Sequence, residues 1–120
     1  MVFITDLQSC QTFISGDKAV LREILHPDKA HLKLRYSLAH ATVKAGATTL
    51  PHRLKTSEVY YILAGKGIMH VNDEYAATEA GHTIYIPPGS KQYIQNTEDT
   101  DLIFLCIADP AWQAEDEEIL

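Results

Sequence analysis

The chain lacks the features that mark several large classes of protein. It has only two cysteines, Cys10 and Cys106, far apart in sequence, and no run of 18 apolar residues. A small disulfide scaffold needs more cysteines, and a membrane-spanning helix needs such a run. The first ten residues contain Asp6 and no basic segment, so we expect no secretory signal. We therefore expect a cytoplasmic protein with free thiols and no membrane partner.

Clustered positive charge is also missing. The 10 lysines and arginines are outnumbered by 16 aspartates and glutamates, which gives a formal net charge of −6. Because nucleic-acid-binding proteins present a basic face, we expect no nucleic-acid partner. The 120 residues and the 46% hydrophobic content are ordinary for one globular domain, so we expect a single domain spanning residues 1–120.

Turn residues recur at short intervals, as in Gly65-Lys66-Gly67, Ala80-Gly81 and Pro87-Pro88-Gly89. Short strands between such turns are typical of an all-β sandwich or barrel. Residues 32–43 alternate with a period of two, and residues 58–63 and 83–86 are rich in β-branched and aromatic side chains. Both patterns indicate strands, so the sequence predicts an all-β fold.

Two of the predicted strands, residues 59–63 and 102–108, are apolar on both faces. The wall of a one-layer barrel should be polar on its outside, so these strands need a second cover. That cover is either the N-terminal segment, residues 1–30, packed on the barrel, or a second subunit. We expect a homodimer.

The two ends of the chain are ambiguous. Residues 20–25 suit either a helix face or a short irregular strand. The acidic tail, residues 110–120, suits either a short helix anchored by Trp112 or a frayed end.

Three metal-capable side chains, His52, Glu58 and Gln92, lie on predicted strands. Alternate residues of a strand share a face, so Tyr60 shares the face of Glu58, and Leu54 that of His52. If these faces point into the barrel, the three side chains converge there. Imidazole, carboxylate and amide oxygen together would hold a divalent ion, with Tyr60 as a hydrogen-bond or proton donor.

Simpler structural roles compete with metal binding at each of these positions. His52 and Glu58 would instead form a hydrogen-bonded pair that holds two strands. Gln92 would instead be a structural amide bonded to the backbone.

Two motifs resemble those of the cupin superfamily of jelly-roll barrels. Residues 46–65 read G-ATTLP-H-R-L-KTS-E-VYYILA-G, and residues 81–96 read G-HTIYI-P-P-G-SK-Q-YIQ-N. The resemblance, closest to small single-domain prokaryotic cupins, implies a jelly-roll (double-stranded β-helix) barrel. It also implies metal ligands at two histidines and the glutamate of the first motif and at one histidine of the second. Here His52 and Glu58 match, whereas Leu54 and Gln92 replace the other two histidines.

The resemblance implies a small cupin that binds a divalent transition metal (Fe, Mn, Zn or Ni) through His52, Glu58 and Gln92. Its small-molecule ligand would be sugar-like or a carboxylate, bound or transformed by isomerase, lyase or dioxygenase chemistry with Tyr60 as a candidate catalytic residue. The alternative is a non-catalytic binding or sensing cupin that has lost its metal. A structural dimer with a filled barrel is a third possibility.

Overall fold

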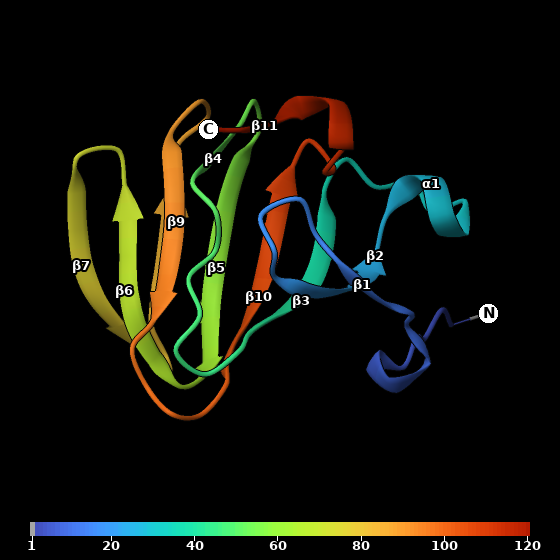
Figure 1. The fold of residues 1–120 in the computed structure, drawn as a ribbon. Helices are drawn as coiled ribbons and strands as arrows, with labels where there is room; N and C mark the ends of the chain where they lie inside the picture. Colours follow the sequence, from blue (N-terminus) through green and yellow to red (C-terminus); the bar gives the residue numbers. More distant parts are fainter. Residues whose placement is uncertain (1) are drawn as a thin grey trace.

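The computed structural model describes residues 2–120, which form two antiparallel sheets that face each other (Figure 1). The first sheet contains, in spatial order, β1 (Thr12–Ile14), β2 (Val20–Leu25), β3 (Ser37–Val43), β10 (Leu102–Asp109), β5 (Ser57–Ala64) and β8 (Thr83–Ile86). The second contains β11 (Glu117–Ile119), β4 (His52–Leu54), β9 (Lys91–Asn96), β6 (Lys66–Val71) and β7 (Glu74–Glu79). The predicted all-β jelly-roll fold is confirmed.

Helical structure is confined to three short segments among residues 2–120. They are the 3-10 helices η1 (Leu7–Ser9) and η2 (Ala114–Asp116) and the α-helix α1 (Pro27–Ala30). Among residues 2–120, no helix is long enough to cross a membrane.

The core lies between the sheets and follows the predicted alternation. In β5 the buried residues are Glu58, Tyr60 and Ile62, and in β9 they are Gln92, Ile94 and Asn96. The apolar cluster consists of Ala19, Ala41, Val43, Tyr60, Ile62, Met69, Ile86, Ile94, Leu102 and Phe104. Because polar and apolar residues share the inward faces, the interior is apolar at its centre and polar where β4, β5 and β9 meet.

The strand predicted over residues 32–43 begins only at Ser37. The preceding residues form a loop, because their groups are engaged elsewhere. The Arg35 carbonyl accepts from the Ala111 amide at 2.7 Å, and the Arg35 guanidinium pairs with Asp109 at 2.8 Å. These contacts hold the loop against the end of β10.

Both segments that the sequence left ambiguous contribute a strand to the sheets. Residues 20–25 form β2, which pairs with β3. The acidic end forms the three-residue 3-10 helix η2 and then β11, which pairs with β4, so a short helix follows Trp112 and the tail is not frayed. The Trp112 indole donates to Glu117 Oε2 at 2.9 Å and so fixes the start of β11.

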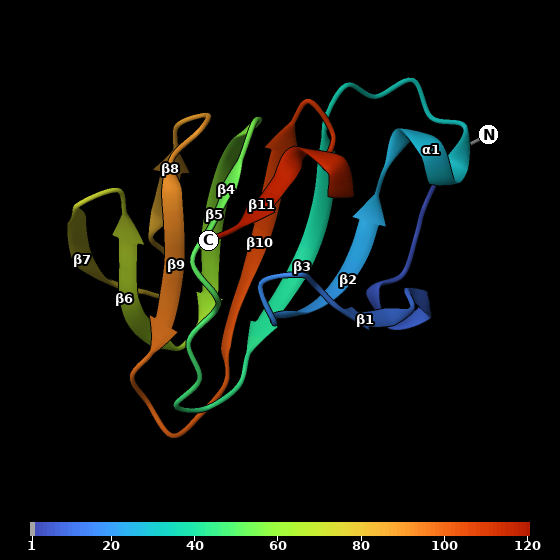
Figure 2. The same cartoon turned by 45° about the horizontal axis from the view of Figure 1, so that its top comes forward.

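The outer face of the six-stranded sheet remains apolar and exposed. Tyr61, Leu63 and Ile107 are 43%, 44% and 38% exposed. The N-terminal strands β1 and β2 extend the sheet sideways beyond β3 (Figure 2). Of the two covers considered for this face, the N-terminal segment leaves these three side chains uncovered.

Candidate functional site

The predicted metal-capable residues point into the interior from both sheets. His52 opens β4 and pairs in register with Gln92 of the neighbouring β9, whereas Glu58 lies on β5 of the opposite sheet. His52, Glu58 and Gln92 are 3%, 4% and 1% exposed. The inward orientation that the predicted convergence requires is therefore found for all three.

A chain of hydrogen bonds links the two sheets at this point. The Tyr60 hydroxyl donates to Gln92 Oε1 at 3.0 Å, and Gln92 Nε2 donates to Glu58 Oε1 at 2.8 Å. The Cys106 thiol donates to Glu58 Oε2 at 2.8 Å. The polar partners of Glu58 are thus Gln92 and Cys106 and not His52, and Gln92 bonds side chains and not the backbone.

Burial shifts the pKa values of the ionisable side chains in this hydrogen-bonded network. It raises the pKa of the Glu58 carboxyl, which the bonds from Cys106 and Gln92 partly oppose. Burial also raises the pKa of Tyr60 and of Cys106 well above their ordinary values, and the nearby Glu58 adds to both shifts. Tyr60 and Cys106 are therefore protonated donors near neutral pH.

The His52 ring is oriented by the backbone. Its Nδ1 lies 2.9 Å from the Leu50 carbonyl oxygen, and since a carbonyl only accepts, Nδ1 must carry the proton and donate. Nε2 faces Asp17 Oδ2 at 3.7 Å, which is too long for a hydrogen bond. Metal-binding histidines are commonly fixed in this way, with one nitrogen bound to a carbonyl and the other left as the ligand.

Asp17 and Cys106 are site residues that the sequence did not reveal. Asp17 lies in the turn between β1 and β2, outside both motifs, and a turn aspartate has an ordinary local role. Cys106 sits in an apolar strand and reads as a core thiol. The one available signal for Cys106 was its parity with Phe104 and Ala108, which places it on the inward face.

An interior cavity of about 50 Å³ lies among these side chains. It is large enough for a few water molecules or an ion, and smaller than the roughly 300–1,000 Å³ of typical ligand pockets. Its charged and metal-capable lining consists of Asp17, Glu23, Glu58, Glu117, His52 and Cys106. No lysine or arginine lines it within residues 2–120, so its charge is acidic.

One carboxylate of the lining, Glu117, has an unused oxygen. Its Oε2 accepts from Trp112, whereas Oε1 is buried and has no hydrogen-bond partner among the described residues. A Cβ on Gly16 would lie 2.8 Å from Oε1, so the glycine allows this carboxylate to approach the Asp17 turn. The Glu23 carboxylate differs, because Lys29 pairs with it at 2.8 Å.

The residues fit a mixed and weak metal site. Among residues 2–120, no three His, Cys, Asp or Glu side chains converge as a ready ligand group. The predicted set includes the amide of Gln92, but Gln92 does not line the cavity, and its Oε1 already accepts from Tyr60. A carboxylate has about four lone-pair sites, so Glu58 keeps acceptor capacity after its two hydrogen bonds, and His52 keeps Nε2.

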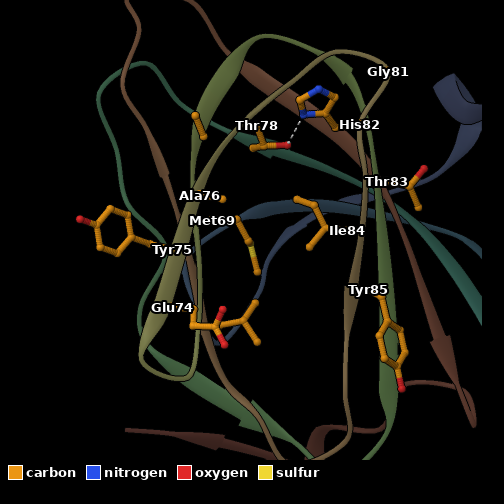
Figure 3. A pocket seen from close by; sticks show the side chains of 12 residues that line it. Met69, Glu74, Tyr75, Ala76, Thr78, Gly81, His82, Thr83, Ile84 and Tyr85 are labelled. Carbon is orange, nitrogen blue, oxygen red and sulfur yellow. Dashed lines mark hydrogen bonds between the residues drawn. The ribbon is translucent and has the colours of Figure 1, made fainter.

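A larger cleft of about 580 Å³ opens between β7 and β8 (Figure 3). Met69 and Ile84 point into it, and Tyr75 points away from it. Its histidine is engaged locally, because His82 Nδ1 accepts from the Glu79 amide at 3.2 Å. None of the predicted site residues lines this cleft, so the smaller interior cavity is the candidate site.

Comparison with known proteins agrees with the two motifs. The sequence model of the cupin domain matches residues 39–108, more than half of the chain and including both motifs. The chain is 39% identical over 117 residues to the uncharacterized protein MJ1618 of Methanocaldococcus jannaschii, across 97% of this chain and 93% of that protein. It is 31% identical over 88 residues to the oxalate-binding protein of Thermotoga maritima, across 72% of each. The chain therefore belongs to the cupin family.

A solved structure supports the fold independently. The crystal structure of a predicted oxalate decarboxylase of Thermotoga maritima superposes with a TM-score of 0.77 at 23% identity. The match covers 90% of this chain and 99% of that one, so nearly the whole fold is shared.

Proposed function

We propose that this cupin binds a divalent metal ion inside the barrel, together with a small polar molecule. The observation that carries the proposal is the acidic cavity. Asp17, Glu58 and Glu117 line it without a lysine or arginine partner among the described residues. Buried negative charge favours a cation, and a divalent ion is the most compact species that would neutralise it.

The ligands in this proposal are His52 through Nε2, Glu58 through a carboxylate oxygen and Gln92 through its carbonyl oxygen. The metal is a transition metal such as Fe, Mn, Zn or Ni, because imidazole favours these ions. When bound, it would supply the positive charge that the lining lacks and polarise an oxygen of the small molecule. Leu54, 2% exposed, forms an apolar wall of the same cavity.

The small molecule is sugar-like or a carboxylate in this proposal. The similarity to an oxalate-binding protein supports the carboxylate. An oxalate-like dianion would be repelled by the acidic lining, so its binding to this chain should require the metal. A neutral, sugar-like molecule faces no such repulsion, so the metal dependence of binding separates the two classes.

If the protein is an isomerase, lyase or dioxygenase, Tyr60 is the candidate proton donor. Burial raises its pKa well above the ordinary value, so the phenol is protonated at neutral pH and is able to donate a hydrogen bond or a proton but not to act as a base. Its hydroxyl also orients the Gln92 amide at 3.0 Å.

A second function is a non-catalytic binding or sensing barrel without metal. The observation that favours it is the hydrogen-bond chain of Tyr60, Gln92, Glu58 and Cys106, in which the site groups already bond one another. In this case the metal-free protein would bind its small molecule directly.

Calorimetric titration of metal-free, untagged protein with Mn²⁺, Ni²⁺ and Zn²⁺ tests the proposal. We expect one bound ion per chain, and affinity at least about ten-fold weaker in His52→Ala. His70→Ala is the matched control, because His70 stacks on Tyr93 at 4.1 Å and does not line the cavity. Wild-type protein that binds no ion would reject the metal and leave the non-catalytic function.

We also propose that the chain forms a homodimer in the cytoplasm. The exposed apolar face of the six-stranded sheet supports the dimer, because Tyr61, Leu63 and Ile107 on neighbouring strands lack a cover. The free thiols Cys10 and Cys106 suit a reducing compartment.

A further inference from the structure

The turn between β1 and β2 presents a carboxylate to the site from outside both cupin motifs. The Ser15 hydroxyl donates to Asp17 Oδ1. The other oxygen, Oδ2, faces His52 Nε2 at 3.7 Å. The turn therefore holds one oxygen of Asp17 and leaves the second pointing at the imidazole.

A single residue ties Asp17 and His52 together. The Leu50 amide donates to the Asp17 carbonyl at 2.8 Å, and the Leu50 carbonyl accepts from His52 Nδ1 at 2.9 Å. The backbone amide of Leu50 thus positions Asp17, and the backbone carbonyl of Leu50 positions His52. Such shared backbone support preorganises two side chains before any ligand arrives.

The spacing of the pair suits two ligands of one ion. At 3.7 Å the nitrogen and oxygen do not share a hydrogen bond. Two ligands with bonds of about 2.1 Å at a tetrahedral angle lie roughly 3.4 Å apart, close to this separation. The His52 residue is 3% exposed, and its Nε2 faces Asp17 Oδ2 beyond hydrogen-bond distance, so this nitrogen is available to a ligand.

We infer that Asp17 is a metal ligand that supplies, from the β1–β2 turn, the donor lost where Leu54 replaces a histidine. This inference rests on the proposed function, namely that the interior binds a divalent ion. It adds a second carboxylate beside Glu58 to the ligand set, so the chain takes harder ions such as Mn²⁺ more readily than an imidazole-rich set would.

Other groups of the cavity agree with this placement. Asp17 and Glu117 line the same cavity as Glu58, so three carboxylates face one small space. Buried carboxylates with no lysine or arginine partner are costly unless a cation joins them. The ion would offset that cost.

Titration of metal-free, untagged protein with Co²⁺, followed by calorimetry and by the visible absorption of the ion, tests the assignment. Asp17→Asn is close in shape and keeps an oxygen for Ser15. We expect it to bind Co²⁺ at least about ten-fold more weakly and to change the absorption bands, because a ligand is replaced. If Asp17→Asn fails to fold, Asp17→Ser keeps a short polar side chain in the turn and serves the same purpose.

Glu23→Gln is the matched control. Glu23 lines the same cavity and carries the same charge, but its carboxylate pairs with Lys29 at 2.8 Å. We expect it to leave the Co²⁺ spectrum unchanged and the affinity within about three-fold of wild type. An equal loss in Glu23→Gln and Asp17→Asn would mean a general charge effect and would overturn the inference.

The outcomes separate this inference from the proposed function. In one outcome, wild type binds Co²⁺, His52→Ala abolishes binding, and Asp17→Asn keeps the wild-type affinity and spectrum. This outcome rejects only the role of Asp17. If wild type binds no Co²⁺, the metal proposal fails and the assignment of Asp17 fails with it.

Discussion

At the scale of single residues, two positions of the second motif that share one face of β9 have different roles. Asn96 of the second motif is structural, because Nδ2 lies within 2.7–3.1 Å of the Thr100, Val43 and Lys44 carbonyls and Oδ1 accepts from the Glu98 amide. Gln92, four residues earlier, instead bonds Tyr60 and Glu58. The inward face of β9 thus contains Asn96, which anchors the neighbouring loops, and Gln92, which belongs to the candidate site.

The motif spacing and strand alternation predicted that His52, Glu58 and Gln92 converge if their faces point into the barrel, and burial in the structure supplies that direction. The spacing could not reveal Asp17. Its approach to His52 depends on the hydrogen bond from the Leu50 amide to the Asp17 carbonyl, which joins segments more than thirty residues apart in sequence.

Leu54→His tests the interpretation of the missing histidine. Leu54 is 2% exposed and lines the cavity, so an imidazole there would add a nitrogen ligand. We expect metal affinity to rise about ten-fold or more, at a cost of about 1–3 kcal/mol in stability from the buried polar ring. Calorimetry and denaturant unfolding measure the two effects.

Leu50→His is the control for that change. The Leu50 side chain is 37% exposed and does not line the cavity, so this variant adds an imidazole outside the site. Equal gains in metal affinity from both variants would contradict the placement of the site.

At the scale of elements, glycines and loop contacts decide where strands end. The sequence predicted the strand-rich pattern and most turns, since both are local. It did not predict β11, because that strand depends on the edge of β4 and on the bond from Trp112 to Glu117. It also extended β3 backwards, since the contacts of Arg35 with β10 are not visible in local alternation.

Two motif glycines form a matched pair for a stability test. Gly65 and Gly46 have φ of +92° and +70°, a region that costs other residues about 1–2 kcal/mol. A Cβ on Gly65 would also lie 2.8 Å from the Asp101 carbonyl oxygen, whereas one on Gly46 meets nothing within 4 Å. We therefore expect Gly65→Ala to destabilise more than Gly46→Ala by about 1–3 kcal/mol in denaturant unfolding. Equal losses would show that the close approach at Gly65 is relieved without cost.

The ion pair of Arg35 with Asp109 predicts a pH effect at the end of β10. The hydrogen bond from Arg35 lowers the pKa of Asp109 below its ordinary value of 3.8. A lowered pKa means stability that is present above pH 3.8 and is lost as the pH falls through the lower, folded-state value. In Arg35→Ala we expect the Asp109 pKa, measured by carboxyl NMR, to rise toward 3.8. An unchanged Asp109 titration would mean that the pair is absent in solution.

At the scale of the whole molecule, the six-stranded sheet borders an acidic cavity on its inner face and has exposed apolar residues on its outer face. The apolar outer strands were visible in the sequence, but their lack of a cover depends on β1 and β2 continuing the sheet sideways (Figure 2). The net charge of −6 keeps a monomer soluble, so the exposed face does not by itself force association.

Tyr61→Lys tests the proposed dimer. Tyr61 is 43% exposed on β5, so the change should leave the fold intact while placing a charge in the interface. By analytical ultracentrifugation we expect wild type to sediment as a dimer and Tyr61→Lys as a monomer. Tyr75→Lys, at a 74% exposed position on β7 outside that sheet, should remain dimeric. A monomeric wild type would contradict the proposal.

The most direct test of the account is an anomalous difference map from crystals of metal-free protein soaked in Mn²⁺. We predict one strong peak in the interior cavity, at bonding distance from His52 Nε2 and from carboxylate oxygens. A cavity filled only by water or side chains, in crystals whose surface carboxylates do bind Mn²⁺, would contradict it.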